Sequence, residues 1–425
     1  MQAAFEASVR RLPRLHLQRL IAKRSSASGI ELKEHEVEAL TKHILAGRAE
    51  PIELEERPGR TSATLTFTEE DGAEIAALSG RIKDEMPGMI EAIATDLSRI
   101  LLRRIRKEWP RIHEEHEANR AAFLETIQLI WGDALDRLDM LMATADSVGG
   151  QAIAAARASR SKKRIAITTA LDRLHVRGVQ VATEILALLR EGFADAAFSR
   201  WRTLHEISVV AMVLGDHGEE IAIRYLDHDL VEAQRAAEVY QRCHPKDAAK
   251  KANAAELRKT KADFDAVVAK YGSAFKSPYG WAAKHLNKDK PTFQHLEEAA
   301  DQAQMRLQYK VASYGVHAGT KGLTVSVADV FGDGPPGGAS IGGLHEAGIE
   351  TAYSLVRLTG ALLGPNWSID KLAGLKALIR LRDDAAKAFS QGGRAMSEAT
   401  WVSEEEFAAW EREAQVSDEV RGKKG

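Results

Sequence analysis

The chain has 425 residues, of which 44% are hydrophobic, so it is long enough for one large or two ordinary domains that each bury a core. Its 59 basic and 61 acidic residues give a formal net charge of −2, which excludes a global positive field of the kind that attracts nucleic acids. Any contact with RNA must therefore be local.

Cysteine content and hydropathy indicate the cellular setting. The single cysteine, Cys243, excludes an internal disulfide and any Cys-x-x-Cys pair for zinc or redox chemistry. Residues 1–24 alternate apolar with basic side chains, unlike a secretory signal, and no apolar run approaches the roughly 18 residues of a membrane span. We expect a cytoplasmic protein without membrane contact.

The spacing of apolar residues predicts an all-α fold. Alanine, leucine, glutamate and arginine recur with apolar steps of three and four residues, which is typical of amphipathic helices. Residues 1–150 are expected to form a charged helical amino-terminal region, with helices near 34–47, 69–109 (interrupted at Pro87) and 115–147 that end at the breaker 148–150. Strand signals are limited to 62–68 and 324–330, so we expect at most a small β-hairpin.

A helical bundle is predicted for the second region. Residues 152–164 are small and basic, which favours an exposed helix end or a connector, placed at 151–166. The bundle covers 167–391, with helices near 166–191, 194–215, 217–243, 246–271, 292–318, 342–363 and 369–390, and the tail 392–425 is expected to be peripheral. The glycine-rich stretch 332–338 predicts a surface loop, either simply flexible or a lid over a site.

The first candidate site lies at residues 200–206. Arg202 and Glu206 are four residues apart, so they share one helix face and can form an ion pair. Residues 207–214 are apolar all round, which indicates that the helix enters the core directly after this pair. The pair is interpreted either as a helix-locking contact or as part of a ligand-binding or catalytic site.

A second polar stripe is predicted on the helix at 292–318. Tyr309, Ser313 and His317 follow one another at four-residue steps, which places a phenol, a hydroxyl and an imidazole along one face. His317 is the best general acid or base candidate, because a helix carboxy-terminus favours the protonated imidazole; a capping role is the alternative. Ser313, His317 and Glu206 also suggest a hydrolase triad, although no strained elbow accompanies the serine.

Other polar groups extend these candidates. Tyr225 and His228 are three residues apart and are assigned to substrate binding. The histidines at 113 and 116 do not have the His-Glu-x-x-His spacing, and no further ligand set has a metal-binding pattern, so neither a metal nor another cofactor is expected. Residues 101–106 carry three arginines, which form either a solvated helix face or a contact for phosphate or an anionic partner.

Three segments resemble a bacterial family known as domain of unknown function 5677. The matching segments are 189–206, 219–228 and 309–317, and the resemblance covers roughly 165–365. It implies a helical fold and almost nothing about activity. The recurrent positions of that family correspond to Arg202, Glu206, Tyr309, Ser313 and His317 in this chain.

A looser resemblance is to HEPN helical ribonucleases, whose signature is an arginine followed four to six residues later by a histidine. Arg200 and His205 fit this spacing, although Trp201 stands where those enzymes usually carry a polar residue. The two are about 140° apart on an uninterrupted helix and would converge only at a bend or across a dimer interface. The resemblance implies metal-independent RNA cleavage, in which Arg200 steadies the phosphoryl group and His205 transfers protons, and it implies a dimeric toxin or phage-defence protein.

Two functions from different classes follow from the sequence. One is a metal-independent ribonuclease that uses Arg200, Arg202, His205, Glu206, Ser313 and His317, with RNA as its substrate. The other is a non-catalytic sensor or interaction module, in which the two polar faces bind a small ligand while the amino-terminal helices engage a protein partner. A homo-oligomer is expected in either case.

Overall fold

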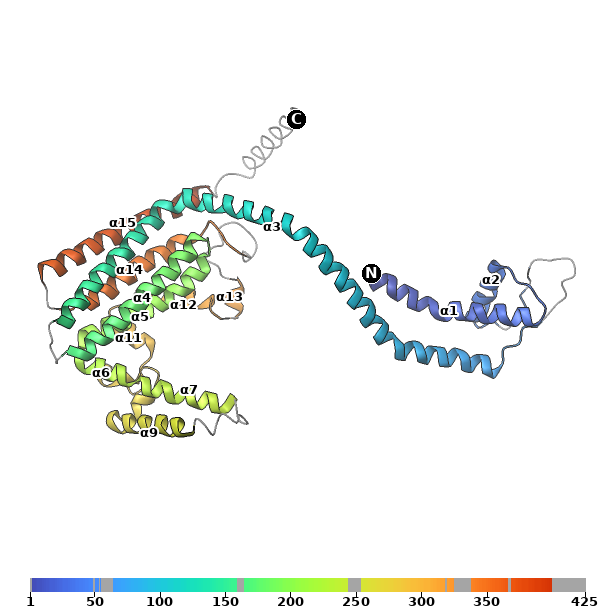
Figure 1. Cartoon of the computed structure of the whole chain (residues 1–425), viewed down its shortest axis with the longest axis horizontal. Helices are drawn as coiled ribbons and strands as arrows, with labels where there is room; N and C mark the ends of the chain where they lie inside the picture. Colours follow the sequence, from blue (N-terminus) through green and yellow to red (C-terminus); the bar gives the residue numbers. More distant parts are fainter. Residues whose placement is uncertain are drawn as a thin grey trace, which may run out of the picture. The chain divides into compact units, whose positions relative to one another are not determined.

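The computed structural model describes residues 2–48, 50–52, 54, 64–158, 164–243, 254–317, 319–324, 338–365 and 368–399. The predicted all-α fold is confirmed, because these residues form helices and contain no strand (Figure 1). The α-helices are α1 (Gln2–Ala27), α2 (Glu34–Leu45), α3 (Glu69–Ala158), α4 (Ile165–Arg190), α5 (Ala194–His217), α6 (Glu219–Asp227), α7 (Asp229–Cys243), α9 (Ala254–Tyr271), α10 (Ala283–Leu286), α11 (Phe293–Ala299), α12 (Arg306–Tyr314), α13 (Thr320–Thr324), α14 (Leu344–Leu363) and α15 (Ile369–Ala399). No helix in the described ranges is long and apolar enough to cross a membrane.

The two predicted strand segments fall mostly outside the described residues. Residues 62 and 63 lie outside them, and 64–68 have no regular secondary structure. Thr324 is the last residue of α13, and 325–330 lie outside the described part, as do residues 332–337 of the predicted glycine-rich loop.

The chain divides into two compact units, Met1–Glu115 and His116–Gly425. The first unit has a small core of Leu17, Ile21 and Leu40, contributed by α1 and α2. Arg24 of α1 also pairs with Asp71 at the start of α3, at 2.8 Å. The unit boundary lies earlier than the predicted end of the amino-terminal region at residue 150, because the part of α3 after Glu115 contributes Ile127, Trp131 and Leu138 to the core of the second unit.

The second unit is built around α5. This helix packs against α4 and α14, and α14 in turn packs against α15. Trp201 of α5 has no exposed surface, and its indole nitrogen donates to Ser354 Oγ on α14 at 3.0 Å. The short helices α11 and α12 also contact α5, as Figure 1 shows. Their polar residues therefore lie against the side of α5 that carries Arg202.

Two predicted helix boundaries within α3 are wrong. The helix continues through Pro87, where a proline removes one hydrogen bond without ending the helix. It also continues through Val148, Gly149 and Gly150 to Ala158, so 151–158 of the predicted connector is helical while 159–163 lies outside the described residues. Gly149 belongs in this helix because a Cβ there would lie 2.2 Å from the buried ring of His175 on α4.

The carboxy-terminal boundary is also displaced. The sequence predicts a peripheral tail from Gly392, but α15 extends through Gly392 to Ala399, and 400–425 lie outside the described residues. A Cβ at Gly392 would lie 2.6 Å from the Trp131 ring, so the glycine allows the indole to pack against this helix. Met396, one turn later, is buried.

Replacing the two adjacent glycines of α3 separates packing from helix propensity. Gly149→Ala should lower the free energy of unfolding by about 1–3 kcal/mol, because the buried His175 ring, bonded to Thr359 Oγ1 at 3.2 Å, must shift. Gly150→Ala meets nothing within 4 Å and should raise it by about 0.5–1 kcal/mol. Urea unfolding of the whole protein measures both, and equal effects of the two substitutions would contradict this packing argument.

Candidate functional site

The predicted ion pair on α5 is present. Arg202 Nε lies 3.2 Å from Glu206 Oε1, and the two side chains are 25% and 33% exposed. The pair therefore lies at the border between core and solvent, where a charge interacts strongly with its neighbours yet remains accessible. This position suits a group that contacts a ligand.

Tyr309 of α12 joins this pair, so the structure brings the two predicted polar faces together. Its hydroxyl donates to Glu206 Oε1 at 2.5 Å, and the Arg202 guanidinium lies over its ring, 4.6 Å from the centroid. Burial, followed by the hydrogen bond to Glu206, raises the pKa of Tyr309 well above its usual value. The phenol therefore keeps its proton at neutral pH.

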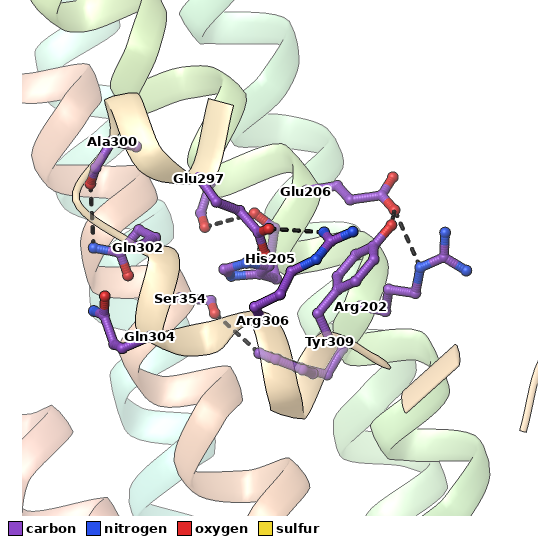
Figure 2. Close-up of polar contacts among 12 residues, drawn as sticks. Arg202, His205, Glu206, Glu297, Ala300, Gln302, Gln304, Arg306, Tyr309 and Ser354 are labelled. Carbon is purple, nitrogen blue, oxygen red and sulfur yellow. Dashed lines mark hydrogen bonds and ion pairs between the residues drawn. The ribbon is translucent and has the colours of Figure 1, made fainter. Parts of the chain in front are cut away.

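A buried carboxylate, Glu297, completes a polar cluster that also contains Arg202, Glu206, Arg306 and Tyr309. Glu297 of α11 has no exposed surface; its Oε1 lies 3.1 Å from His205 Nε2, and its Oε2 accepts from Arg306 Nη1 at 2.8 Å. Figure 2 shows this carboxylate between the imidazole and the guanidinium. Arg306 also lies over the Tyr309 ring, 5.1 Å from its centroid, so two guanidinium groups stack on one tyrosine.

His205 is a core residue in this arrangement. Its side chain has no exposed surface and packs against Trp201, Phe293 and Tyr309. Because the ionised Glu297 carboxylate can only accept, this contact favours a proton on Nε2. His205 thus holds Glu297 in place and does not reach solvent.

Arg200 and His205 do not converge within the chain. Arg200 pairs with Glu184 of α4 and donates to Thr203 Oγ1 at 3.3 Å. The helix α5 continues from Ala194 to His217, so the two residues remain on different faces.

The predicted stripe of Tyr309, Ser313 and His317 is interrupted. Ser313 Oγ donates to the Tyr309 carbonyl at 2.7 Å, along its own helix. The helix α12 ends at Tyr314, earlier than the predicted 318, and His317 lies exposed beyond it. Beyond Tyr314 the chain turns back so closely that a Cβ at Gly322 of α13 would lie 2.2 Å from the Tyr314 carbonyl oxygen.

Tyr225 and His228 belong to a separate aromatic cluster. The Tyr225 ring makes an edge-to-face contact with Trp281 at 5.1 Å, and His228 Nε2 bonds to the Ser277 carbonyl at 3.0 Å. Burial lowers the pKa of His228, so its imidazole is neutral at pH 7. Both side chains stabilise the end of α6, and no contact between described residues joins them directly to Tyr309.

Three members of the cluster were not predicted from the sequence. Arg306 lies one helical turn before Tyr309, and this i, i+3 spacing was a usable signal. Glu297 gave no local signal, because the contact of its short helix α11 with α5 is what buries it. Tyr279, which is partly buried beside this group, gave no local signal either. Burial raises the pKa of Tyr279 to about 12, with a further contribution from the Glu206 carboxylate.

The cluster lies within the part of the chain that matches a known family model. Residues 169–334 match the Family of unknown function (DUF5677). This DUF5677 match covers less than half of the chain and includes α4 to α12, hence every member of the cluster. No curated protein and no solved structure matches the chain significantly.

The cluster combines two positive and two negative side chains in a small volume. Arg202 and Arg306 are balanced by Glu206 and Glu297, so the group is close to neutral while both guanidinium groups remain partly exposed. Among the described residues, no group of three or more histidine, cysteine, aspartate or glutamate side chains could hold a metal ion. The planar guanidinium groups of Arg202 and Arg306 are able to donate paired hydrogen bonds to an anion.

The buried carboxylate gives a stability prediction. Arg306→Ala removes the guanidinium from the fully buried Glu297 and should lower the free energy of unfolding by about 1–3 kcal/mol, a range that allows for the 32% exposure of the arginine side chain. In the double variant with Glu297→Gln, the loss in the free energy of unfolding should be smaller than the sum of the two single losses, because both changes remove the same interaction. Urea unfolding of the single and double variants gives the coupling energy.

The matched control is the interhelical pair of Arg190 with Asp139, whose side chains are 47% and 49% exposed. Arg190→Ala should cost less than about 1 kcal/mol, because a solvated pair contributes little. If Arg306→Ala costs no more than Arg190→Ala, the assignment of Arg306 as the compensating charge for Glu297 is wrong.

Proposed function

We propose that the cluster is the ligand site of a non-catalytic helical sensor or interaction module that binds a small phosphate-bearing molecule such as a nucleotide. The observation that carries the proposal is the pair of partly exposed guanidinium groups stacked on Tyr309, at 4.6 and 5.1 Å from the ring centroid. A planar guanidinium donates two parallel hydrogen bonds to a phosphate, which a lysine ammonium does not.

The contacts around the arginines support binding because they pre-organise both side chains. Arg306 is held by the buried Glu297, and Arg202 by Glu206 and the tyrosine ring. An incoming phosphate can replace Glu206 as the partner of Arg202, because Glu206 keeps its hydrogen bond from Tyr309. Less side-chain freedom is then lost on binding than at a flexible arginine.

The distribution of histidines favours binding over catalysis. General acid–base cleavage of RNA needs a titratable group within hydrogen-bond reach of the 2′-hydroxyl and the leaving oxygen. His205 has no exposed surface, and His317 lies on an exposed bend outside the cluster. The predicted toxin or phage-defence ribonuclease, with Arg200 and His205 in its site, would require an accessible His205, whereas this side chain has no exposed surface.

Ligand titrations with the whole protein test the binding proposal. ATP, AMP and inorganic phosphate are added in a thermal-shift assay, and the dissociation constant is measured by calorimetry. A nucleotide at 100 times its dissociation constant should stabilise the protein by about 2.7 kcal/mol, which shifts Tm by several degrees. Absence of any shift at millimolar ligand would refute the proposal.

Substitutions at Arg202 locate the site. Arg202→Ala should weaken nucleotide binding by roughly tenfold or more, and Arg202→Lys should weaken it less, because the charge is kept while the bidentate geometry is lost. The matched control is Arg380→Ala on an exposed face of α15, which should leave binding unchanged. Equal loss in the Arg202 and Arg380 variants would indicate nonspecific charge attraction.

The same proteins distinguish binding from RNA cleavage. Total RNA or transfer RNA incubated with the purified protein in EDTA should remain intact under this proposal. Cleavage that disappears in His205→Ala or in His317→Ala would instead support the ribonuclease prediction. Cleavage that both variants retain would show that neither His205 nor His317 is required for the activity.

A further inference from the structure

A cavity of about 700 Å³ lies in the second unit, where α3 ends and where α4 and α15 begin. It is lined by residues of α3 between Ala152 and Arg157, by Arg164 and residues of α4 up to Arg173, by the last two residues of α14 and by Lys371 in the first turn of α15. A volume of this size is typical of sites that bind small molecules. We call it the basic cavity.

Aliphatic side chains form the inner wall of the basic cavity. Ile153, Ile167, Leu171 and Leu363 line it, and each is at most 8% exposed. Water beside such a wall gains few hydrogen bonds, so the wall favours contact with an apolar group. The inner part of the cavity therefore suits the apolar body of a ligand.

Four cationic side chains line the same cavity against a single carboxylate. The cations are Arg157, Arg164, Arg173 and Lys371, and the carboxylate is Asp172. Arg157 donates to Asp172, so these two charges cancel. Among the residues that the structure describes, no carboxylate forms an ion pair with the other three cations. The cavity is therefore electrically positive, although the chain as a whole is close to neutral.

Two of these cations meet at the carboxy-terminal end of α14. Lys371 Nζ donates to the Leu363 carbonyl at 2.7 Å, and Arg164 Nη2 would lie 3.6 Å from a Cβ at Gly364, the residue that follows α14. A helix carboxy-terminus carries about half a negative charge, so capping it offsets only part of two full positive charges. Burial, followed by the charge of Arg164, lowers the pKa of Lys371. An anion placed between the two cations would relieve their repulsion.

From these cations and this buried aliphatic wall we propose that the basic cavity binds an organic phosphate monoester whose organic group is apolar. The phosphate lies at Arg164 and Lys371, and the organic group lies against the wall. A phosphate monoester carries about −1.5 to −2 charges at pH 7, which matches two unpaired cations better than the single charge of a carboxylate does. No member of the Arg202 cluster lines this cavity, so the inference is independent of the function proposed above.

Calorimetric titration of the whole protein with 1-naphthyl phosphate tests the proposal. The Arg202→Ala variant is used beside the wild type, so that phosphate binding at the Arg202 cluster is weakened. In both proteins 1-naphthyl phosphate should bind at least tenfold more tightly than inorganic phosphate or 1-naphthol, because each of these lacks one of the two parts that the cavity contacts. No binding at millimolar ligand, or equal affinity for 1-naphthol and its phosphate, would overturn the proposal.

Substitutions of the two cations locate the phosphate. The double variant Arg164→Gln with Lys371→Gln should weaken binding of 1-naphthyl phosphate about tenfold or more, because both donors to the phosphate lose their charge. The matched control is Lys376→Gln, an exposed position on α15 that does not line the cavity, and it should leave binding unchanged. A loss as large in the Lys376 variant would show general charge attraction and would contradict the assigned site.

A cavity-filling substitution tests the position of the organic group. Ala152→Phe keeps all four cations but adds a ring to a half-buried position of the wall, so it should abolish binding of 1-naphthyl phosphate. Circular dichroism and the Tm confirm that the variants remain folded. Unchanged affinity in a folded Ala152→Phe protein would overturn the placement of the ligand in this cavity.

Discussion

A carboxylate with no exposed surface determines how the polar side chains of the second unit are arranged. An unpaired buried carboxylate is strongly unfavourable, so Glu297 has to lie where donors can reach it, between His205 and Arg306. This requirement fixes α11 and α12 against the same stretch of α5. Arg306 is thereby held over Tyr309, and Tyr309 in turn donates to Glu206. The surface features of the site thus depend on one buried contact.

The sequence predicts the parts of this site that depend on helix geometry alone. Four-residue spacing is sufficient to pair Arg202 with Glu206, and the same logic places Tyr309 on a polar face. Spacing does not reveal which face meets which neighbour. The burial of Glu297 arises because the short helix α11 docks on α5, and nothing in its local sequence encodes that contact. His205 fits a catalytic spacing, but the packing of aromatic rings makes it a core residue.

The helix boundaries show the same division between local and tertiary effects. The all-α fold and the positions of α2, α4, α5 and α14 follow from apolar periodicity and agree with the structure. The glycines at 149 and 392 are local breaker signals, yet both lie inside helices because the rings of His175 and Trp131 occupy the space of a side chain. Conversely, the helix expected to reach 318 ends at Tyr314, where α13 turns back against its carboxyl end. Neighbouring elements decide each of these cases.

The near-zero net charge of the chain conceals two different uses of charge. In the first unit, exposed charges of α3 pair along their own helix, as Asp96 does with Arg99 at 2.9 Å. In the second unit, the charges of two arginines and two glutamates cancel within one cluster. The buried carboxylate and the tyrosine ring fix the orientation of the two guanidinium groups. Net charge excludes a uniform field, but recognition depends on where each charge is fixed and on how much solvent surrounds it. For this chain, the order of charges along the helices therefore carries more functional information than their sum.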